Sequence, residues 1–231
     1  MIARNGKPAV SQFYPVGFHG DTYLLSCVEC VMKKTDVFIE TGAHVGSTLA
    51  FIARTWPRVT CYSCEPDQAA CSEAAQNIAR ENLNNVMLYN DDSQNFLVRI
   101  KRDHAGVFNS STTFWLDAHG NGFEWPLKDE VRFITHHFTN AFVFIDDFLV
   151  PGMECFGYDH YDNQVCSFEY IRDALNPSRN YMIYYPDYRE KTSSHHPLRG
   201  WGLITFGAKK NIDFGKKMHD KVRIQSCAGQ A

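Results

Sequence analysis

Two kinds of apolar pattern alternate along this chain, and together they predict its secondary structure. Short runs of β-branched and aromatic residues are typical of buried strands. They occur at residues 37–39, 59–63, 86–89, 113–116, 141–145, 181–185 and 201–206. Segments in which apolar residues recur every three or four positions are typical of helices. They occur at residues 22–34, 47–54, 68–82, 96–100, 126–138 and 168–175.

The order of these elements predicts the fold class. Strands alternate with helices through the first five units, which indicates a parallel sheet with right-handed crossovers. No helical pattern separates the last two strands, so we expect the final one to insert antiparallel. The prediction is an α/β, doubly wound, mostly parallel seven-stranded sheet with an antiparallel last strand. We expect one domain over residues 1–231, with an irregular segment at 1–21 and a C-terminal tail at 209–231.

Composition and charge narrow the class of protein. The 231 residues are 44% hydrophobic and 21% charged, as in a soluble globular protein. A net charge of −3 offers no general attraction to nucleic acid or to an anionic membrane, so we expect neither as a partner. Residues 1–20 lack the continuous apolar core of a signal peptide, and no apolar run reaches membrane-spanning length. We therefore expect a cytoplasmic protein.

Eight cysteines raise the question of a zinc site. Cys27 and Cys30, like Cys61 and Cys64, have the spacing of paired zinc ligands. The first pair falls within a helical pattern, however, and the second lies in a strand, where residues three apart point to opposite faces. We expect reduced thiols that serve as small hydrophobic residues.

A glycine turn follows the first predicted strand. Val37, Phe38 and Ile39 lead into Glu40, after which Gly42 and Gly46 precede the helical pattern of residues 47–54. A strand, a glycine turn and a helix form the ligand-binding corner of a doubly wound fold. Glycine lets the backbone turn tightly and come close to a ligand. The alternative is an ordinary turn between a strand and a helix.

Carboxylates gather at the ends of the predicted strands. Six lie at or just beyond those ends: Glu40, Glu65, Asp92, Asp117, Asp146 and Asp147. Ligands of open α/β sheets bind at the carboxyl ends of the strands. One such carboxylate is usually a helix cap, but capping does not readily explain their presence after five consecutive strands.

The first of these carboxylates suit a nucleoside. Glu65 follows Gly42 by 23 residues, the usual spacing for a carboxylate that accepts both hydroxyls of a ribose. Asp92 and Ser93, after the third strand, can hold an adenine edge through a side-chain acceptor and a backbone N–H.

The last three carboxylates suggest a metal. Asp117, Asp146 and Asp147 would meet at neighbouring strand ends, and a hard divalent cation would relieve their repulsion. No Lys or Arg lies in residues 118–125 or 146–162 to do so instead. His119 would lie near the metal and is a candidate general base, the alternative being an exposed loop histidine.

With these motifs the chain resembles a class I S-adenosylmethionine-dependent methyltransferase over residues 22–208. Glu40, Gly42 and Gly46 resemble the first motif of that family. Residues 114–120 and 144–148 resemble the metal-dependent O-methyltransferases that act on sugars in macrolide pathways and, more remotely, catechol O-methyltransferase. His44 stands where the broader class often has a middle glycine. Gly120 stands where the catechol enzymes have a basic lysine.

The resemblance implies roles for particular residues. The residues implied to bind the cofactor are Glu40, Gly42, Gly46, Ser47, Thr48, Glu65, Asp92, Ser93 and Asp117. Those implied to bind Mg²⁺ are Asp117, Asp146 and Asp147. We expect Asp117 and His119 to be the catalytic residues, with His119 chosen as the base only for its nearness to the metal, because the base of the catechol enzymes cannot be carried over.

We therefore expect metal-assisted O-methylation of a hydroxyl on a small polar, carbohydrate-like or phenolic acceptor. The loop at 151–165, with Tyr158, His160, Tyr161 and Asp162, and the connection at 184–199 would wall the acceptor site. An NAD-dependent oxidoreductase is an alternative, but the G-x-G-x-x-G turn is absent. A metal-dependent enzyme that acts on a nucleotide sugar is a second alternative, but that function would leave the glycine turn and Glu65 without a role. A non-catalytic protein that keeps only the cofactor site is a further alternative.

Overall fold

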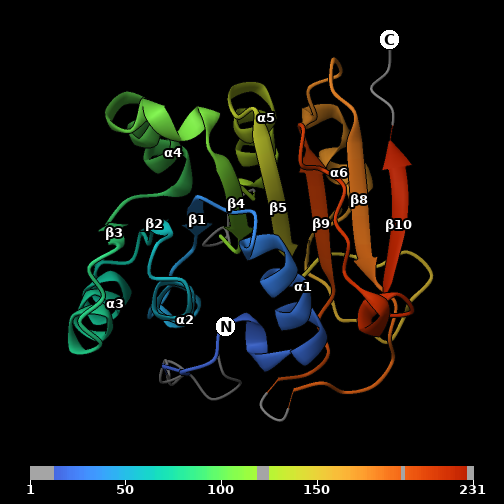
Figure 1. The fold of residues 1–231 in the computed structure, drawn as a ribbon, viewed down its shortest axis with the longest axis horizontal. Helices are drawn as coiled ribbons and strands as arrows, with labels where there is room; N and C mark the ends of the chain where they lie inside the picture. The colour runs from blue at the N-terminus through green and yellow to red at the C-terminus, as the bar shows by residue number, and fades with distance from the viewer. Residues whose placement is uncertain (1–12, 119–124, 194–195, 228–231) are drawn as a thin grey trace.

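The chain folds around one large twisted sheet (Figure 1). The computed structural model describes residues 13–118, 125–193 and 196–227. The eight strands of the sheet lie in the order β10-β8-β9-β5-β4-β1-β2-β3. Their bounds are β1 Val37–Thr41, β2 Thr60–Cys64, β3 Val86–Tyr89, β4 Ser111–Leu116, β5 Asn140–Asp146, β8 Tyr181–Pro186, β9 Trp201–Phe206 and β10 Val222–Cys227.

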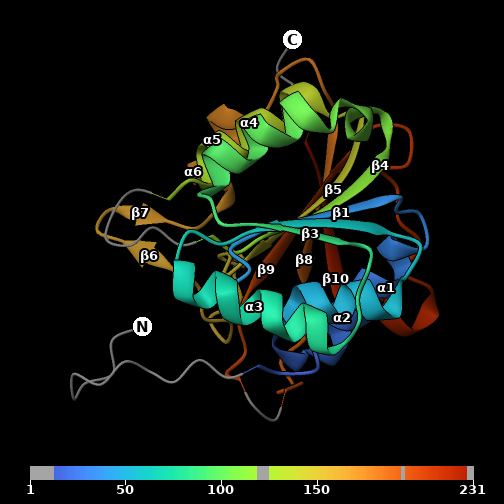
Figure 2. The same cartoon turned by 90° about the vertical axis from the view of Figure 1, so that its left-hand side faces the viewer.

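Helices cover both faces of this sheet, as Figure 2 shows. Helices α1, α2 and α3 lie on one face, and α4, α5 and α6 lie on the other. Their bounds are α1 Thr22–Met32, α2 Ser47–Thr55, α3 Gln68–Arg80, α4 Ser93–Asp103, α5 Leu127–His137 and α6 Phe168–Ile171. Within the described ranges, none of the helices combines the length and apolar character that crossing a bilayer requires.

The predicted fold class is confirmed. Strands β1 to β5 pair in parallel, and β9 inserts antiparallel between β5 and β8. The number of strands is larger than predicted, because β10 forms within the segment expected to be a tail and pairs antiparallel with β8. Strands β6 (His160–Tyr161) and β7 (Gln164–Val165) form a separate ribbon in the loop at 151–165.

The cysteines take their predicted places. Cys27 and Cys30 lie in helix α1, and Cys61 and Cys64 lie in strand β2. All four carry free thiols, and three of them, Cys27, Cys61 and Cys64, are fully buried in the hydrophobic core. They therefore act there as small hydrophobic residues.

The segment before helix α1 is tied to the start of strand β9. Asp21 caps the helix by accepting hydrogen bonds from the backbone N–H groups of Tyr23 and Leu24. Its other carboxylate oxygen accepts from the Tyr188 hydroxyl, which in turn accepts from the Trp201 indole N–H at 3.0 Å. Trp201 lies beside Asp146, the last residue of β5, in the sheet. The tie therefore holds residues 18–21 at the carboxyl edge of the sheet.

We expect Tyr188→Phe to destabilise the fold. It leaves the Asp21 oxygen and the Trp201 N–H, both buried, without their partner, at a cost of about 1–3 kcal/mol. Urea unfolding of the variant, the wild type and Tyr158→Phe measures this cost, since Tyr158 is exposed and serves as the matched control. Equal midpoints for all three proteins would show that the tie contributes no stability.

Candidate functional site

The glycine turn after β1 has the tight geometry predicted for it. Gly42 has φ +84°, and a Cβ atom at this position would lie 2.5 Å from the backbone oxygen of Asp117. Gly46 has φ +81° and immediately precedes helix α2. The N–H groups of Gly42 and Ala43 donate to the carbonyl of Cys64 at 3.1 and 2.9 Å, which ties the turn to the end of β2. Only glycine fits at position 42 without displacing the end of β4.

Glu65 lies directly beside this turn. One oxygen of its carboxylate accepts from the His44 N–H at 2.8 Å, and the other accepts from the Asp67 N–H at 2.9 Å. The side chain is 9% exposed. Each oxygen has a second lone pair, so the carboxylate can accept further hydrogen bonds while it holds the turn.

Glu40 is a buried acid next to the turn. Its carboxylate accepts a hydrogen bond from the Ser63 hydroxyl at 2.7 Å, across the β1–β2 pair. Burial raises the pKa of Glu40 to about 8, and the charges of Asp117 and Glu65 act in the same direction against the Ser63 bond. Glu40 is therefore mainly protonated at neutral pH until a positive group comes near it.

Other residues predicted to bind the cofactor have structural partners. Asp92 is exposed and caps helix α4 through bonds from the Asn95 backbone and side chain, while Ser93 is buried. The Ser47 hydroxyl accepts from the Tyr14 N–H at 3.0 Å, and the Thr48 hydroxyl accepts from the Phe18 N–H at 3.4 Å. Asp92 thus takes the ordinary capping role, and the two hydroxyls hold the N-terminal segment.

Two of the three carboxylates predicted to bind magnesium pair with basic side chains. The Nε2 atom of His19 lies 2.6 Å from Asp146. Asp147 pairs with Arg199, which also pairs with Asp159 of the loop at 151–165. Among the described residues, no group of three or more His, Cys, Asp or Glu side chains is placed to hold a metal ion. The magnesium prediction therefore has no support among the described residues, where His19 pairs with Asp146 and Arg199 pairs with Asp147.

Asp117 and His119, the predicted catalytic pair, are only partly described. A carboxylate oxygen of Asp117 lies 3.4 Å from the Trp115 indole nitrogen, at the end of β4. His119 lies outside the described residues.

The charge states of His19, Asp146, Asp147 and Arg199 depend on one another. Burial alone would lower the pKa of His19, but the charge and hydrogen bond of Asp146, with Asp117 and Asp147, raise it to about 9. Burial and the charge of Asp146 raise the pKa of Asp147 to about 6, against the effect of Arg199. The His19 and Arg199 side chains are therefore cations at neutral pH.

The sequence analysis singled out none of His19, His196 and Arg199, although His196 and Arg199 both lie in the connection predicted to wall the acceptor site. The His196 ring stacks on His19, with centroids 4.3 Å apart. No local pattern marks these residues. Of the predicted wall residues in the loop at 151–165, Tyr158, His160 and Asp162 are exposed, and Tyr161 packs on Trp125.

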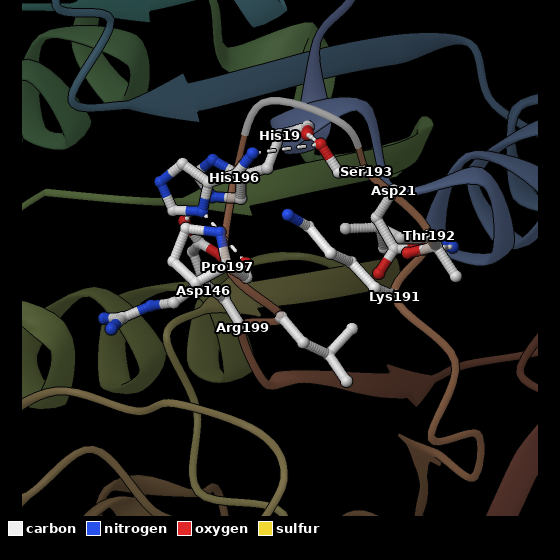
Figure 3. A pocket seen from close by; sticks show the side chains of 11 residues that line it. His19, Asp21, Asp146, Lys191, Thr192, Ser193, His196, Pro197 and Arg199 are labelled. Carbon is white, nitrogen blue, oxygen red and sulfur yellow. Dashed lines mark hydrogen bonds and ion pairs between the residues drawn. The ribbon is translucent and has the colours of Figure 1, made fainter.

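His19, His196 and Arg199 line a pocket at the carboxyl edge of the sheet, which we call the histidine pocket (Figure 3). It is a small hollow that is partly open to solvent. Its lining residues are His19, Asp21, Leu24, Asp146, Lys191, Thr192, Ser193, His196, Pro197, Leu198 and Arg199. A second hollow is lined by Asp117, Glu130, Asp147, Asp159 and neighbouring apolar residues. Asp146 borders both, so the two hollows are adjacent.

Comparison with known proteins supports the fold assignment. No protein-family model and no curated protein sequence matches the chain. An O-methyltransferase from Bacillus cereus in complex with S-adenosylhomocysteine is 14% identical, with a TM-score of 0.58 over 85% of this chain and 84% of that one. TomG from Streptomyces achromogenes, an O-methyltransferase of tomaymycin synthesis in complex with S-adenosylmethionine, is 15% identical, with a TM-score of 0.56 over 80% and 79%.

A third similar structure has a different kind of substrate in its name. It is an rRNA methylase from Streptococcus thermophilus, 11% identical, with a TM-score of 0.50 over 85% of this chain and 98% of that one. At such low identities the likeness shows the fold, so the chain has the α/β fold of class I methyltransferases.

The buried acid Glu40 gives a test of the site's electrostatics. Because its folded pKa of about 8 exceeds the unfolded value of 4.5, its contribution to stability is complete below pH 4.5 and is lost as the pH rises through 8. In Glu40→Gln this loss, at most about 1.4 kcal/mol per pH unit, should disappear. Urea midpoints at pH 5 and pH 8.5 measure it against exposed Glu29→Gln as the control. Parallel pH profiles for Glu40→Gln and the wild type would contradict the assignment.

Proposed function

We propose that this protein transfers the methyl group of S-adenosylmethionine to an oxygen atom of a small polar acceptor. The observation that carries the proposal is the contact of Glu65 with the glycine turn, beside buried Glu40, in a chain with the class I methyltransferase fold. Two of the similar structures are O-methyltransferases bound to S-adenosylmethionine or to its product, which supports this cofactor and an oxygen acceptor.

The residues around the turn fit such a cofactor. Glu65 has lone pairs left for the two ribose hydroxyls. Ser93, beside Asp92 after β3, would lie at the adenine. Glu40 is a buried acid near two other carboxylates, and the amino group and sulfonium of the cofactor would supply the positive charge that favours its ionised form. Asp117, whose backbone approaches Gly42, would lie along the methionine end.

The acceptor would occupy the histidine pocket, next to the cofactor. Asp146 borders both this pocket and the hollow that contains Asp117, so the two ligands would meet there. The pocket's lining of imidazole, hydroxyl, ammonium and guanidinium groups suits a polar acceptor. The net charge of −3 also favours a small molecule over RNA, which needs basic surface.

The protein's part in the reaction is then chiefly orientation. The sulfonium of the bound cofactor is already activated for methyl transfer. The bond between sulfur and the methyl carbon breaks and leaves its electron pair on sulfur, while the acceptor oxygen forms the new bond to carbon and gives up its proton. Holding both reactants in line can supply much of the rate enhancement.

We expect Glu65→Ala to weaken S-adenosylmethionine binding at least tenfold, which corresponds to about 1.4 kcal/mol. The substitution removes the ribose acceptor and also the anchor of the His44 and Asp67 N–H groups. Isothermal calorimetry measures the affinity, with Glu29→Ala as the control at an exposed position. Unchanged affinity in Glu65→Ala would remove Glu65 from the cofactor site.

The whole proposal is tested with the wild-type protein and methyl-labelled S-adenosylmethionine. Incubated with a metabolite extract, the protein should produce a labelled small molecule that is heavier than its precursor by one CH₂ group. Calorimetry with NAD serves as the comparison for the oxidoreductase alternative. Binding of NAD but not of S-adenosylmethionine would reject the proposal.

A further inference from the structure

The two stacked histidines, His19 and His196, differ in their hydrogen-bond partners. His19 donates or shares its Nε2 hydrogen with Asp146 at 2.6 Å, and its ring lies within 4.3 Å of the His196 ring at an angle of 24° (Figure 3). His196 has no carboxylate among its hydrogen-bond partners in the described part of the chain. Its Nδ1 atom lies 3.2 Å from the carbonyl oxygen of Pro197. The pair therefore consists of one imidazole held by an acid and one held by a backbone carbonyl.

The Pro197 carbonyl fixes the tautomer of His196. A carbonyl oxygen can only accept, so Nδ1 of His196 must carry the hydrogen. In the neutral ring, Nε2 then has the free lone pair and can take a proton. Burial and the charge of neighbouring His19 both lower the pKa of His196, which keeps the ring neutral at neutral pH. His196 is thus a proton acceptor on the wall of the pocket.

Two basic side chains of the protein, His19 and Arg199, are held by ion pairs at the proposed acceptor pocket. His19 is held against Asp146, and Arg199 is held against Asp147 and Asp159. A divalent cation at Asp146 and Asp147 would have to displace both partners. The same carboxylates that a metal would use instead orient two cationic side chains at the pocket.

We propose that the stacked histidines activate the acceptor oxygen in place of a divalent cation, with His196 as the general base and His19 as the fixed positive group. This inference rests on the proposed methyl transfer. Nε2 of His196 takes the hydroxyl proton, and the electron pair of that O–H bond stays on oxygen as it bonds to the methyl carbon. His19, oriented by Asp146, stabilises the negative charge that develops on oxygen. His196 then releases the proton to solvent at the open side of the pocket.

The tautomer is tested first, on the wild-type protein without any acceptor. Nitrogen-15 NMR of histidine-labelled protein at pH 7 should show His196 as a neutral ring protonated on Nδ1 and His19 as a charged ring. His196→Gln and His19→Gln spectra assign the two signals by their loss. A His196 ring protonated on Nε2 would overturn the proposal, because it would have no lone pair free for the acceptor.

The second test measures methyl transfer from labelled S-adenosylmethionine to the metabolite extract, with both solutions passed over chelating resin and kept in excess EDTA. We expect the wild type to remain active, His196→Gln to lose about 100-fold or more of the rate, and exposed His136→Gln to match the wild type. Affinity for S-adenosylmethionine should stay within about twofold in His196→Gln, which checks that the variant is folded.

The outcomes separate this inference from the proposed function. Transfer that stops in EDTA and returns with Mg²⁺, or stoichiometric Mn²⁺ binding seen by electron paramagnetic resonance, would overturn the histidine mechanism and leave methyl transfer intact. Full activity of His196→Gln would also overturn it. A wild type that binds no S-adenosylmethionine and transfers no methyl group would instead reject the proposed function.

Discussion

The carboxyl edge of the sheet depends on how its acidic side chains are compensated. Parallel strands bring their carboxylates to one edge, where unpaired buried charge is costly. Four acids of the described edge are compensated in three ways: Glu40 is kept mainly neutral, Glu65 accepts backbone N–H groups, and Asp146 and Asp147 pair with cations. The segment before α1 and the connection into β9 contribute those cations. Their placement over this edge thus follows from the charge that the topology collects there.

Most of the fold follows from local pattern. Strands β3 and β9 lie at the predicted residues 86–89 and 201–206, and Asp67 begins helix α3 by capping it. Strand β10 gives a weaker signal, since it lies at the edge of the sheet and Ile224 is 53% exposed. An edge strand packs only part of its surface, so its residues need not show the apolar run of a central strand.

The two halves of the candidate site differ in how far sequence could predict them. The glycine turn and Glu65 come from adjacent strands joined by one helix, so their spacing reveals their proximity. His19 is 127 residues from Asp146, and Arg199 is 52 from Asp147. A search for basic residues beside the acids in sequence therefore finds none. The antiparallel insertion of β9 explains Arg199, because it starts that strand at the edge where β5 ends.

The two halves of the candidate site also differ in how readily substitutions can change their chemistry. The proposed cofactor half is built into the alternating strands and helices, where Gly42 packs on β4 and cannot change without strain. Apart from Asp146 of β5, the residues that line the histidine pocket come from 19–24, 191–193 and 196–199, which lie outside the strands of the sheet. A substitution there alters which cation faces Asp146 and Asp147 while the sheet and the glycine turn keep their contacts. If the proposed mechanism holds, metal-dependent and metal-free activation are alternatives on one scaffold, decided by whether these segments place cations on Asp146 and Asp147.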